Sequence, residues 1–157
     1  MKTDRAAKLL AALIKKNLSL STAESCSGGA LASRITDIPG SSAIFLLGVV
    51  TYSNNAKTKI LKVSKCVILS EGAVSAIVAK LMSENIRKLA GSNLGVGITG
   101  IAGPGGGSAR KPVGTVFISV SSKGKTEVRK FHFLGTRQEI KQKTTDKAIE
   151  MLLKFAR

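Results

Sequence analysis

Three polar segments of the sequence carry residue types that could perform chemistry, and the first runs from Thr22 to Gly29 (TAESCSGG). It combines the carboxylate of Glu24, the hydroxyl of Ser25, the thiol of Cys26 and two glycines. A strand-to-helix turn of this composition points backbone N–H groups and the positive end of a helix at one spot, which suits an oxyanion or a phosphate. The alternative is a helix cap whose glycines allow close packing.

The second segment, TYSNNAK, places Tyr52 and Lys57 on either side of an expected strand-to-helix junction. If Tyr52 ends the strand and Lys57 lies one turn into the helix, both polar ends can face the same cleft. An amine in that position could act as a general base, provided that burial or neighbouring cations lower its pKa. The alternative is an ordinary solvated lysine.

The third segment is glycine-rich and runs from Thr99 to Ser108 (TGIAGPGGGS). Glycine lets the backbone approach a ligand closely, so this segment could cradle a phosphate or an amide. It lacks the Gly-Lys-Ser/Thr ending of a phosphate-binding P-loop and the helix that follows a dinucleotide fingerprint. The alternative is a flexible structural loop.

The remaining residue types limit which catalysts are possible. A Ser-His-Asp triad would need the one histidine, His132, which shares a strand face with Lys130 and is expected to be exposed. No His, Cys or Asp cluster has metal-ligand spacing, so a metal site is not expected. If a serine is activated here, lysine is the obvious base. Cys26 is a rival nucleophile for which no base partner can be named.

The overall composition indicates one folded domain. With 157 residues, 43% of them hydrophobic, the chain is expected to form a single domain over residues 1–157. Its longest apolar run, Ala43–Val50, is too short for a membrane span, and its N-terminus does not resemble a signal peptide. Two cysteines, Cys26 and Cys66, are too few for a disulfide framework, which favours a reducing cytoplasm.

A net charge of +16 would attract polyanions. However, the 25 Lys and Arg residues are spread along the chain, and aromatic residues make up only 4% of it, with no Trp to stack on bases. Phe131 and Phe133 alternate with His132, which is typical of a buried strand face rather than a base-stacking pair. We therefore expect a basic surface rather than a nucleic-acid partner.

The candidate segments need helices and strands to position them. Apolar spacing predicts a helix over residues 5–16 and another over 73–90, the latter with Val74, Ile77, Val78 and Leu81 in one stripe and a stop at Gly91. Shorter helices are expected after the first segment, ending near residue 35, and from a cap at Asn54 through residue 61. The sequence TRQE over residues 136–139 is a capping box that opens the last helix.

Strands are expected between these helices, and their order indicates the fold class. They cover residues 18–22, 43–53 (long and mostly buried), 94–99, 114–120 and 126–133, the last two as a hairpin. Helices between strands, followed by one hairpin, predict an α/β protein with a mixed sheet covered by helices.

Six segments together resemble the CinA C-terminal domain family and occur in that family's order. They are residues 22–29, 40–42, 50–57, 72–75, 97–104 and 111–116, so the likeness spans nearly the whole chain. The resemblance implies a single-domain three-layer α/β/α sandwich with a mixed sheet of about five strands. Stand-alone members hydrolyse the carboxamide of nicotinamide mononucleotide to nicotinate mononucleotide and ammonia in pyridine nucleotide salvage. Longer members carry an extra N-terminal domain, which is not expected here.

The resemblance also implies a serine–lysine mechanism without metal or cofactor. Ser25 would be the nucleophile, Lys57 its general base, and Tyr52 would assist proton transfer or orient the amide. Arg137 would bind the phosphate of a small nucleotide substrate. Further substrate or oxyanion contacts are expected from residues Glu24, Ser27, Gly28, Gly29, Thr99, Gly100 and Gly103. The implied protein is a cytoplasmic homodimer or larger homo-oligomer, without membrane attachment.

Three places depart from the family pattern. Many relatives have acidic residues in the stretch Gly105–Arg110 and at Asn55, and Arg where Lys141 stands. A lysine keeps the charge but loses the bidentate fork that suits phosphate. These departures leave two alternatives to the nucleotide amidase open. One is a hydrolase of another small amide, and the other is a weakly catalytic basic binding module for nucleic acid or a partner protein.

Overall fold

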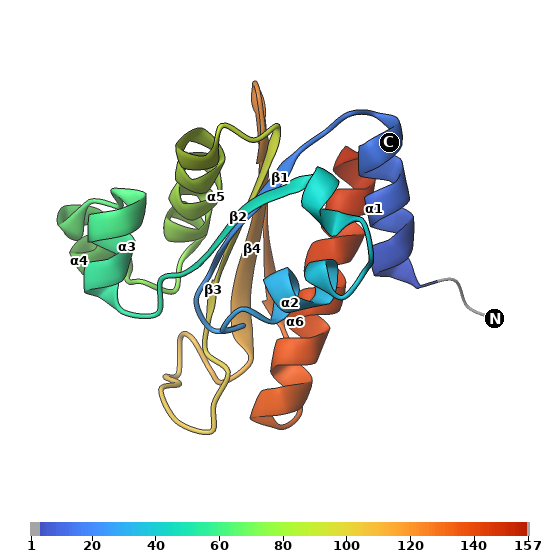
Figure 1. Cartoon of the computed structure of the whole chain (residues 1–157). Coiled ribbons are helices and arrows are strands. Elements are labelled where there is room, and N and C mark those ends of the chain that lie inside the picture. The colour runs from blue at the N-terminus through green and yellow to red at the C-terminus, as the bar shows by residue number, and fades with distance from the viewer. Residues whose placement is uncertain (1–3, 157) are drawn as a thin grey trace.

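A five-stranded sheet separates two layers of helices in the computed structural model, which describes residues 4–156 (Figure 1). In chain order the elements are α1 (Arg5–Lys15), β1 (Leu20–Glu24), α2 (Ala30–Thr36), the 3-10 turn η1 (Ser41–Ala43), β2 (Phe45–Val50), α3 (Asn54–Leu61), α4 (Lys65–Glu71), α5 (Ala76–Ala90), β3 (Leu94–Gly100), β4 (Thr115–Ser122), β5 (Lys125–His132) and α6 (Arg137–Phe155).

The strand order is β2-β1-β3-β4-β5. The first three strands of that order run parallel, whereas β4 and β5 are antiparallel additions joined as a hairpin. The three parallel strands therefore bring their carboxyl ends to the same edge of the sheet, and it is there that α/β proteins commonly bind ligands. The expected three-layer α/β/α fold with a mixed, five-stranded sheet is confirmed.

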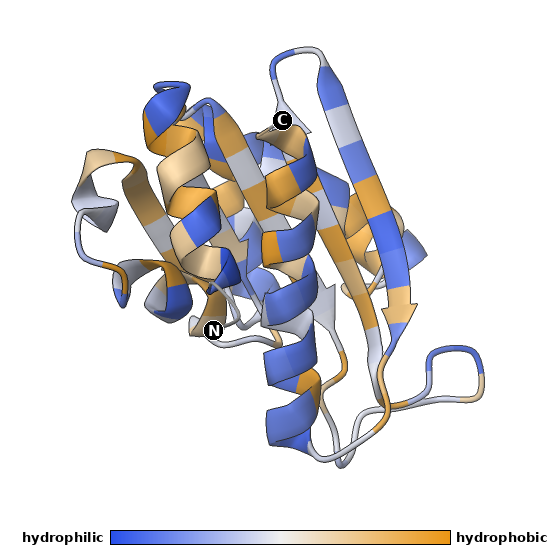
Figure 2. Ribbon diagram, turned by 90° about the vertical axis from the view of Figure 1, so that its right-hand side faces the viewer, coloured by the Kyte–Doolittle hydropathy of each residue, from blue (hydrophilic) through white to orange (hydrophobic). Residues whose placement is uncertain are grey.

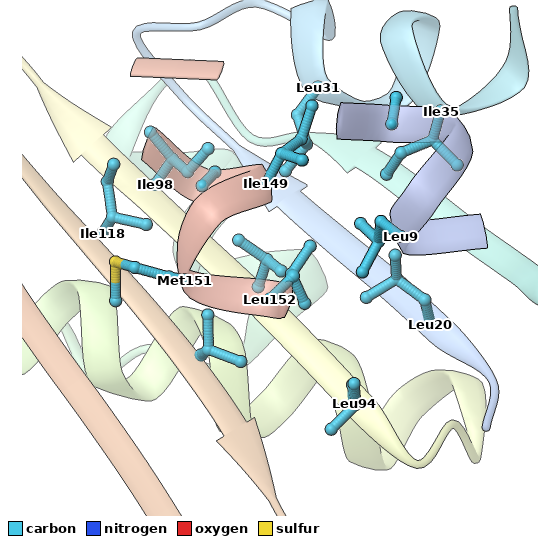
Figure 3. Close-up of a cluster of buried hydrophobic side chains, with 14 of the residues drawn as sticks. Leu9, Leu20, Leu31, Ile35, Leu94, Ile98, Ile118, Ile149, Met151 and Leu152 are labelled. Carbon is cyan, nitrogen blue, oxygen red and sulfur yellow. The ribbon is translucent and has the colours of Figure 1, made fainter. Parts of the chain in front are cut away.

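One face of the sheet packs against α1, α2 and α6. Its core contains Leu9 from α1, Leu31 from α2 and Leu152 from α6, over Leu20 and Ile98 of the sheet (Figure 3). All five side chains are buried, because the apolar stripes of the helices and the strands meet face to face. This layer holds α2 and the start of α6 at the carboxyl edge.

The other face is covered by α5, with α3 and α4 beside it (Figure 1). Close approach of α5 depends on glycines in β3. A Cβ on Gly97 would stand 2.4 Å from the carbonyl oxygen of Ala79, and one on Gly95 would stand 2.2 Å from that of Ser83. Both distances are far inside van der Waals contact, so only glycine permits this packing.

Two of the predicted signals at helix ends are confirmed, but the cap expected at Asn54 is wrong, because Ser53 is the N-cap of α3 and Asn54 is its first residue. Thr136 and Glu139 form the capping box of α6, each side chain accepting the backbone N–H of the other residue. Gly91 ends α5 in the left-handed conformation with φ of 65°. The predicted hairpin is also confirmed, with β4 and β5 paired from Thr115 and His132 to Ser122 and Lys125.

Several predicted elements need correction. The strand expected over residues 43–53 is shorter, Phe45–Val50, and alternates between exposed and half-buried residues because β2 is an edge strand. The first strand spans Leu20–Glu24 rather than residues 18–22. α4 was not predicted, and α5 begins at Ala76, so its predicted stripe is only partly right: Val78 is buried, but Ile77 is exposed.

The opposite edge strand, β5, is mainly hydrophilic (Figure 2). His132 is exposed, as predicted, and the rings of Phe131 and Phe133 stack 5.4 Å apart, partly buried against the core. They therefore pack against the core rather than standing free as a platform for bases. Within residues 4–156, no helix has the length and apolar character needed to cross a membrane.

Candidate active site

A cleft of about 220 Å³ opens at the carboxyl edge of the parallel strands. Ser25 follows β1, Thr99 and Gly100 end β3, and Tyr52 follows β2, so the strand order brings all three predicted segments together. The lining residues are Ser25, Cys26, Tyr52, Asn54, Lys57, Ala73, Val74, Thr99, Gly100, Ala102 and Arg137.

Ser25 and Lys57 form a hydrogen-bonded pair inside this cleft. The Nζ of Lys57 lies 3.0 Å from the Oγ of Ser25, and it also donates to the carbonyl oxygen of Thr51 at 2.8 Å. Lys57 is only 1% exposed, so the alternative of a solvated surface lysine is wrong. It points inward because Ser53 caps α3, accepting the N–H of Ala56, and so fixes the first turn that carries Lys57.

Burial makes Lys57 a better base than an ordinary lysine. Desolvation lowers its pKa below the usual value of 10.5, because the cleft disfavours the ammonium form. The Cys26 sulfur nearby acts in the opposite direction, and its influence is smaller than that of burial. No carboxylate accepts a hydrogen bond from this amine within the described residues. The neutral amine can therefore accept the Ser25 proton.

Cys26 is a weaker candidate for the nucleophile. Burial raises the pKa of its thiol to about 12, so it remains protonated at neutral pH. Only the thiolate is strongly nucleophilic. Of the two adjacent residues, Ser25 is thus the one that the structure supplies with a base.

Glu24 holds the turn that presents Ser25. Its carboxylate accepts the backbone N–H groups of Gly29 (3.2 Å), Leu31 (3.1 Å) and Ala32 (2.8 Å) at the start of α2. It is 1% exposed and does not line the cleft. The predicted role of Glu24 in substrate contact therefore gives way to helix capping, in which a carboxylate satisfies N–H groups that have no partner within the helix.

Some backbone N–H groups of this turn donate to a backbone carbonyl, and others do not. The N–H of Ser25 donates to Ile98, and that of Gly28 donates to the carbonyl of Ser25. By contrast, the N–H groups of Cys26 and Ser27 lie near the Cys26 sulfur, where they lower its pKa slightly against the larger effect of burial. Neither of them has a backbone acceptor among the described residues, so these are the two N–H groups next to Ser25 for which a developing oxyanion could compete with the Cys26 sulfur.

Arg137 joins three elements at the mouth of the cleft. Its guanidinium donates to the hydroxyl of Tyr52 and to the carbonyl oxygen of Gly103, each at 2.7 Å. Tyr52 is 59% exposed, so this bridge spans the solvent side of the site. One turn further along α6, Lys141 lies over the start of α2, where its Nζ would stand 3.4 Å from a Cβ on Gly28.

The start of the glycine-rich segment forms a wall of the cleft, and the hydroxyl of Thr99 is already used in a hydrogen bond. The hydroxyl of Thr99 donates to the carbonyl oxygen of Ala73 at 2.8 Å. A Cβ on Gly100 would stand 2.8 Å from the carbonyl oxygen of Thr115 and 3.0 Å from the Sγ of Cys26. Glycine at this position therefore lets the wall of the cleft close on Cys26.

Six of the predicted site residues line the cleft, and five do not. Ser25, Tyr52, Lys57, Thr99, Gly100 and Arg137 line it, whereas Glu24, Ser27, Gly28, Gly29 and Gly103 lie outside its lining. Sequence reasoning missed Asn54, Ala73, Val74 and Ala102 as lining residues. Val74 was assigned to a helix stripe, and small apolar residues carry no chemical signal that distinguishes a cleft wall from a core.

Among residues 4–156, no group of three or more His, Cys, Asp or Glu could hold a metal ion.

Curated proteins that are similar to this chain carry related descriptions. The chain is 50% identical over 147 residues to a putative competence-damage inducible protein of Moorella thermoacetica, covering 94% of this chain and 36% of that protein. It is also 50% identical over 135 residues to a CinA-like protein of Geotalea uraniireducens, covering 86% and 32% respectively. The chain thus spans about a third of the length of these curated relatives.

Solved structures resemble nearly the whole chain. The competence/damage inducible protein CihA from Agrobacterium tumefaciens superposes with a TM-score of 0.95 at 38% identity, covering 98% of this chain and 94% of that one. A CinA superfamily protein from Escherichia coli gives 0.92 at 34% identity, covering 96% and 88%. The model of the CinA C-terminal domain matches residues 2–156. Together with the shared architecture, these matches show that the chain belongs to the CinA C-terminal domain family.

Proposed function

We propose that this domain is an amidohydrolase that converts nicotinamide mononucleotide to nicotinate mononucleotide and ammonia. The observation that carries the proposal is the buried Ser25–Lys57 pair, with 3.0 Å between Oγ and Nζ. The substrate class comes from the resemblance of the site motifs to those of stand-alone CinA-type amidases. Because the chain spans about a third of its curated relatives, the proposal concerns this domain alone.

The first half of the reaction forms an acyl-enzyme. Neutral Lys57 takes the proton of the Ser25 hydroxyl while Oγ attacks the carboxamide carbon, giving a tetrahedral intermediate. Its oxyanion accepts hydrogen bonds from the N–H groups of Cys26 and Ser27. Lys57 then gives its proton to the amide nitrogen, the C–N bond breaks, and ammonia leaves.

The second half releases the acid. Water gives a proton to neutral Lys57 and attacks the ester carbon, and collapse of this intermediate returns the proton to Ser25 Oγ. The carbonyl oxygen of Thr51 keeps the Lys57 amine oriented in both halves, since it accepts one of its N–H groups at 2.8 Å. Both halves use the same base and the same donors.

Cations at the mouth of the cleft suit the phosphate of a mononucleotide. Arg137 lines the cleft, and Lys141 lies one turn away on α6. The N-terminal turn of α2 adds a partial positive charge nearby. Substrate phosphate would therefore meet positive charge while the carboxamide lies at Ser25.

The test is ammonia release from nicotinamide mononucleotide by the purified protein with a chelator present. The parent should turn over, and Ser25→Ala should lose at least about 10³-fold in kcat. Ser70→Ala, an exposed serine on α4, is the matched control and should keep the parental rate. Mass spectrometry of the parent trapped with substrate should find an acyl adduct on the peptide that contains Ser25.

Two outcomes would contradict the proposal in different ways. Full turnover by Ser25→Ala would refute the serine mechanism. Turnover of other small amides but not of the mononucleotide would keep the chemistry and refute the substrate.

A further inference from the structure

We propose a second anion-binding site, specific for a phosphate group on a small molecule, at the opposite end of the sheet from the Ser25 cleft. The site is a pocket of about 400 Å³ between α5 and the β4–β5 turn, here named the distal basic pocket. It is defined by Lys80, Glu84, Arg87, Lys88, Lys125 and Thr126. Its existence does not depend on the proposed amidase function.

The two sites lie at opposite ends of the same strands. β4 begins at Thr115, beside the glycine-rich segment, and ends at Ser122 in the distal basic pocket, eight residues or about 25 Å away. Likewise, α5 begins near the cleft and ends at the pocket. In Figure 1 the β4–β5 turn lies at the top, whereas the glycine-rich loop lies at the bottom. No substrate of mononucleotide size could span both.

The pocket has an excess of positive charge. Four cations line it, Lys80, Arg87, Lys88 and Lys125, against the one carboxylate of Glu84. That carboxylate accepts the hydroxyl of Thr126 at 2.8 Å, and none of the four cations takes part in a salt bridge within the described residues. The carboxyl end of α5 adds only about half a negative charge. A substantial positive charge therefore remains unbalanced.

Arg87 is the most constrained cation of the pocket. Its side chain lines the pocket, while its Nε is buried behind that surface and has no hydrogen-bond acceptor among the described residues. Its stem is fixed against β3, since the Cβ of Arg87 would stand 2.7 Å from a Cβ on Gly95. A partly desolvated guanidinium whose Nε has no acceptor holds its charge at a cost, so an oxyanion bound at the part that lines the pocket gains more than it would at an exposed arginine.

The guanidinium and ammonium groups of the distal basic pocket are suited to bind phosphate. A guanidinium offers a planar fork that matches two phosphate oxygens, and lysine ammonium groups neutralise the remaining charge. None of the residues that line the pocket is aromatic, and the neighbouring Phe155 ring lies under the Lys125 ammonium, with 4.9 Å between Nζ and the ring centroid, so the lining offers no ring to stack on a base. A concave pocket also fits a compact phosphate better than the continuous backbone of a nucleic acid, and the Glu84 carboxylate is turned to the Thr126 hydroxyl.

The test is a titration of the full chain with inorganic phosphate and with pyrophosphate, followed by amide NMR signals. Saturable shifts should appear at residues 122–126. Arg87→Gln should weaken binding there at least about tenfold, and the double variant Lys80→Gln/Lys88→Gln should weaken it similarly. The double variant changes two exposed side chains, so it keeps the test informative if Arg87→Gln does not fold.

Two control variants separate this site from other sources of anion binding. Arg137→Gln at the cleft and Lys59→Gln on the exposed side of α3 should leave the shifts at residues 122–126 unchanged. The proposal is overturned if phosphate moves only signals near the cleft, or if Lys59→Gln weakens binding as much as the double variant does. It is also overturned if a short DNA duplex moves residues 122–126 and neither phosphate probe does.

Discussion

Replacing Lys57 by methionine should stabilise the fold while it removes the proposed activity. Methionine has a similar unbranched stem and can fill the space of a side chain that is 1% exposed. The substitution removes an amine that burial deprives of water, which is why its pKa is lowered, so the folded state no longer contains this desolvated polar group. An active-site lysine whose pKa is lowered by burial is expected to lower the stability of the fold in return for its catalytic role.

The size of the effect follows from two opposing contributions. The carbonyl oxygen of Thr51 and the Oγ of Ser25 lose their hydrogen bonds from Nζ, at 2.8 and 3.0 Å, and these losses together cost about 2 kcal/mol. Removing the desolvated amine stabilises the fold by more than that loss. We therefore expect the free energy of unfolding to rise by ~1 kcal/mol at pH 7. For a domain of this length the melting temperature should rise by about 2–4 °C.

The gain should depend on pH with a defined sign. The unfolded chain holds the Lys57 proton up to about pH 10.5, whereas the folded chain releases it at a lower pH. Between these two values the unfolded state binds more protons, so the stability contributed by this group to the parent rises with pH. The advantage of Lys57→Met should therefore shrink as the pH approaches 10.5.

Chemical denaturation of parent and variant at pH 7 and at mildly alkaline pH measures this difference, alongside ammonia release. Lys57→Met should lose at least about 10³-fold in kcat. Lys59→Met, on the exposed side of the same helix, is the matched control and should change neither activity nor the pH dependence of stability. A Lys57→Met protein that is less stable than the parent at pH 7, or one that keeps its activity, would refute the reasoning.

Three further predictions test how the site is built. Arg137→Gln should raise KM for nicotinamide mononucleotide about tenfold or more but leave kcat/KM for the riboside without phosphate unchanged, as steady-state kinetics would reveal. Glu24→Ala unpairs three N–H groups of α2 and should lower the free energy of unfolding by about 3 kcal/mol in urea titrations; no loss would contradict the capping role. Gly97→Ala forces a Cβ against the Ala79 carbonyl and should cost about 3 kcal/mol or more, and a wild-type melting temperature would contradict this.

Residue types and their local spacing were enough to predict much of the architecture. The capping box at Thr136 and the stop at Gly91 depend on backbone geometry within a few residues, so local sequence predicts them correctly. α4 was missed because its apolar residues Val67, Ile68 and Leu69 are consecutive and show no helical period. The exposure of β2 was also mispredicted, since an apolar strand looks the same in sequence at the centre of a sheet and at its edge.

The site shows the same division between local and long-range information. The serine, the lysine and the glycines are visible in the sequence as chemically capable residues at strand ends. Their meeting depends on β1 and β2 lying side by side in parallel, which brings Ser25 within 3.0 Å of a lysine 32 residues away. Burial of that lysine, which lowers its pKa, and the turning of Glu24 toward α2 are likewise consequences of packing. Local spacing specifies which groups are available, but only long-range packing sets their distances, solvation and partners.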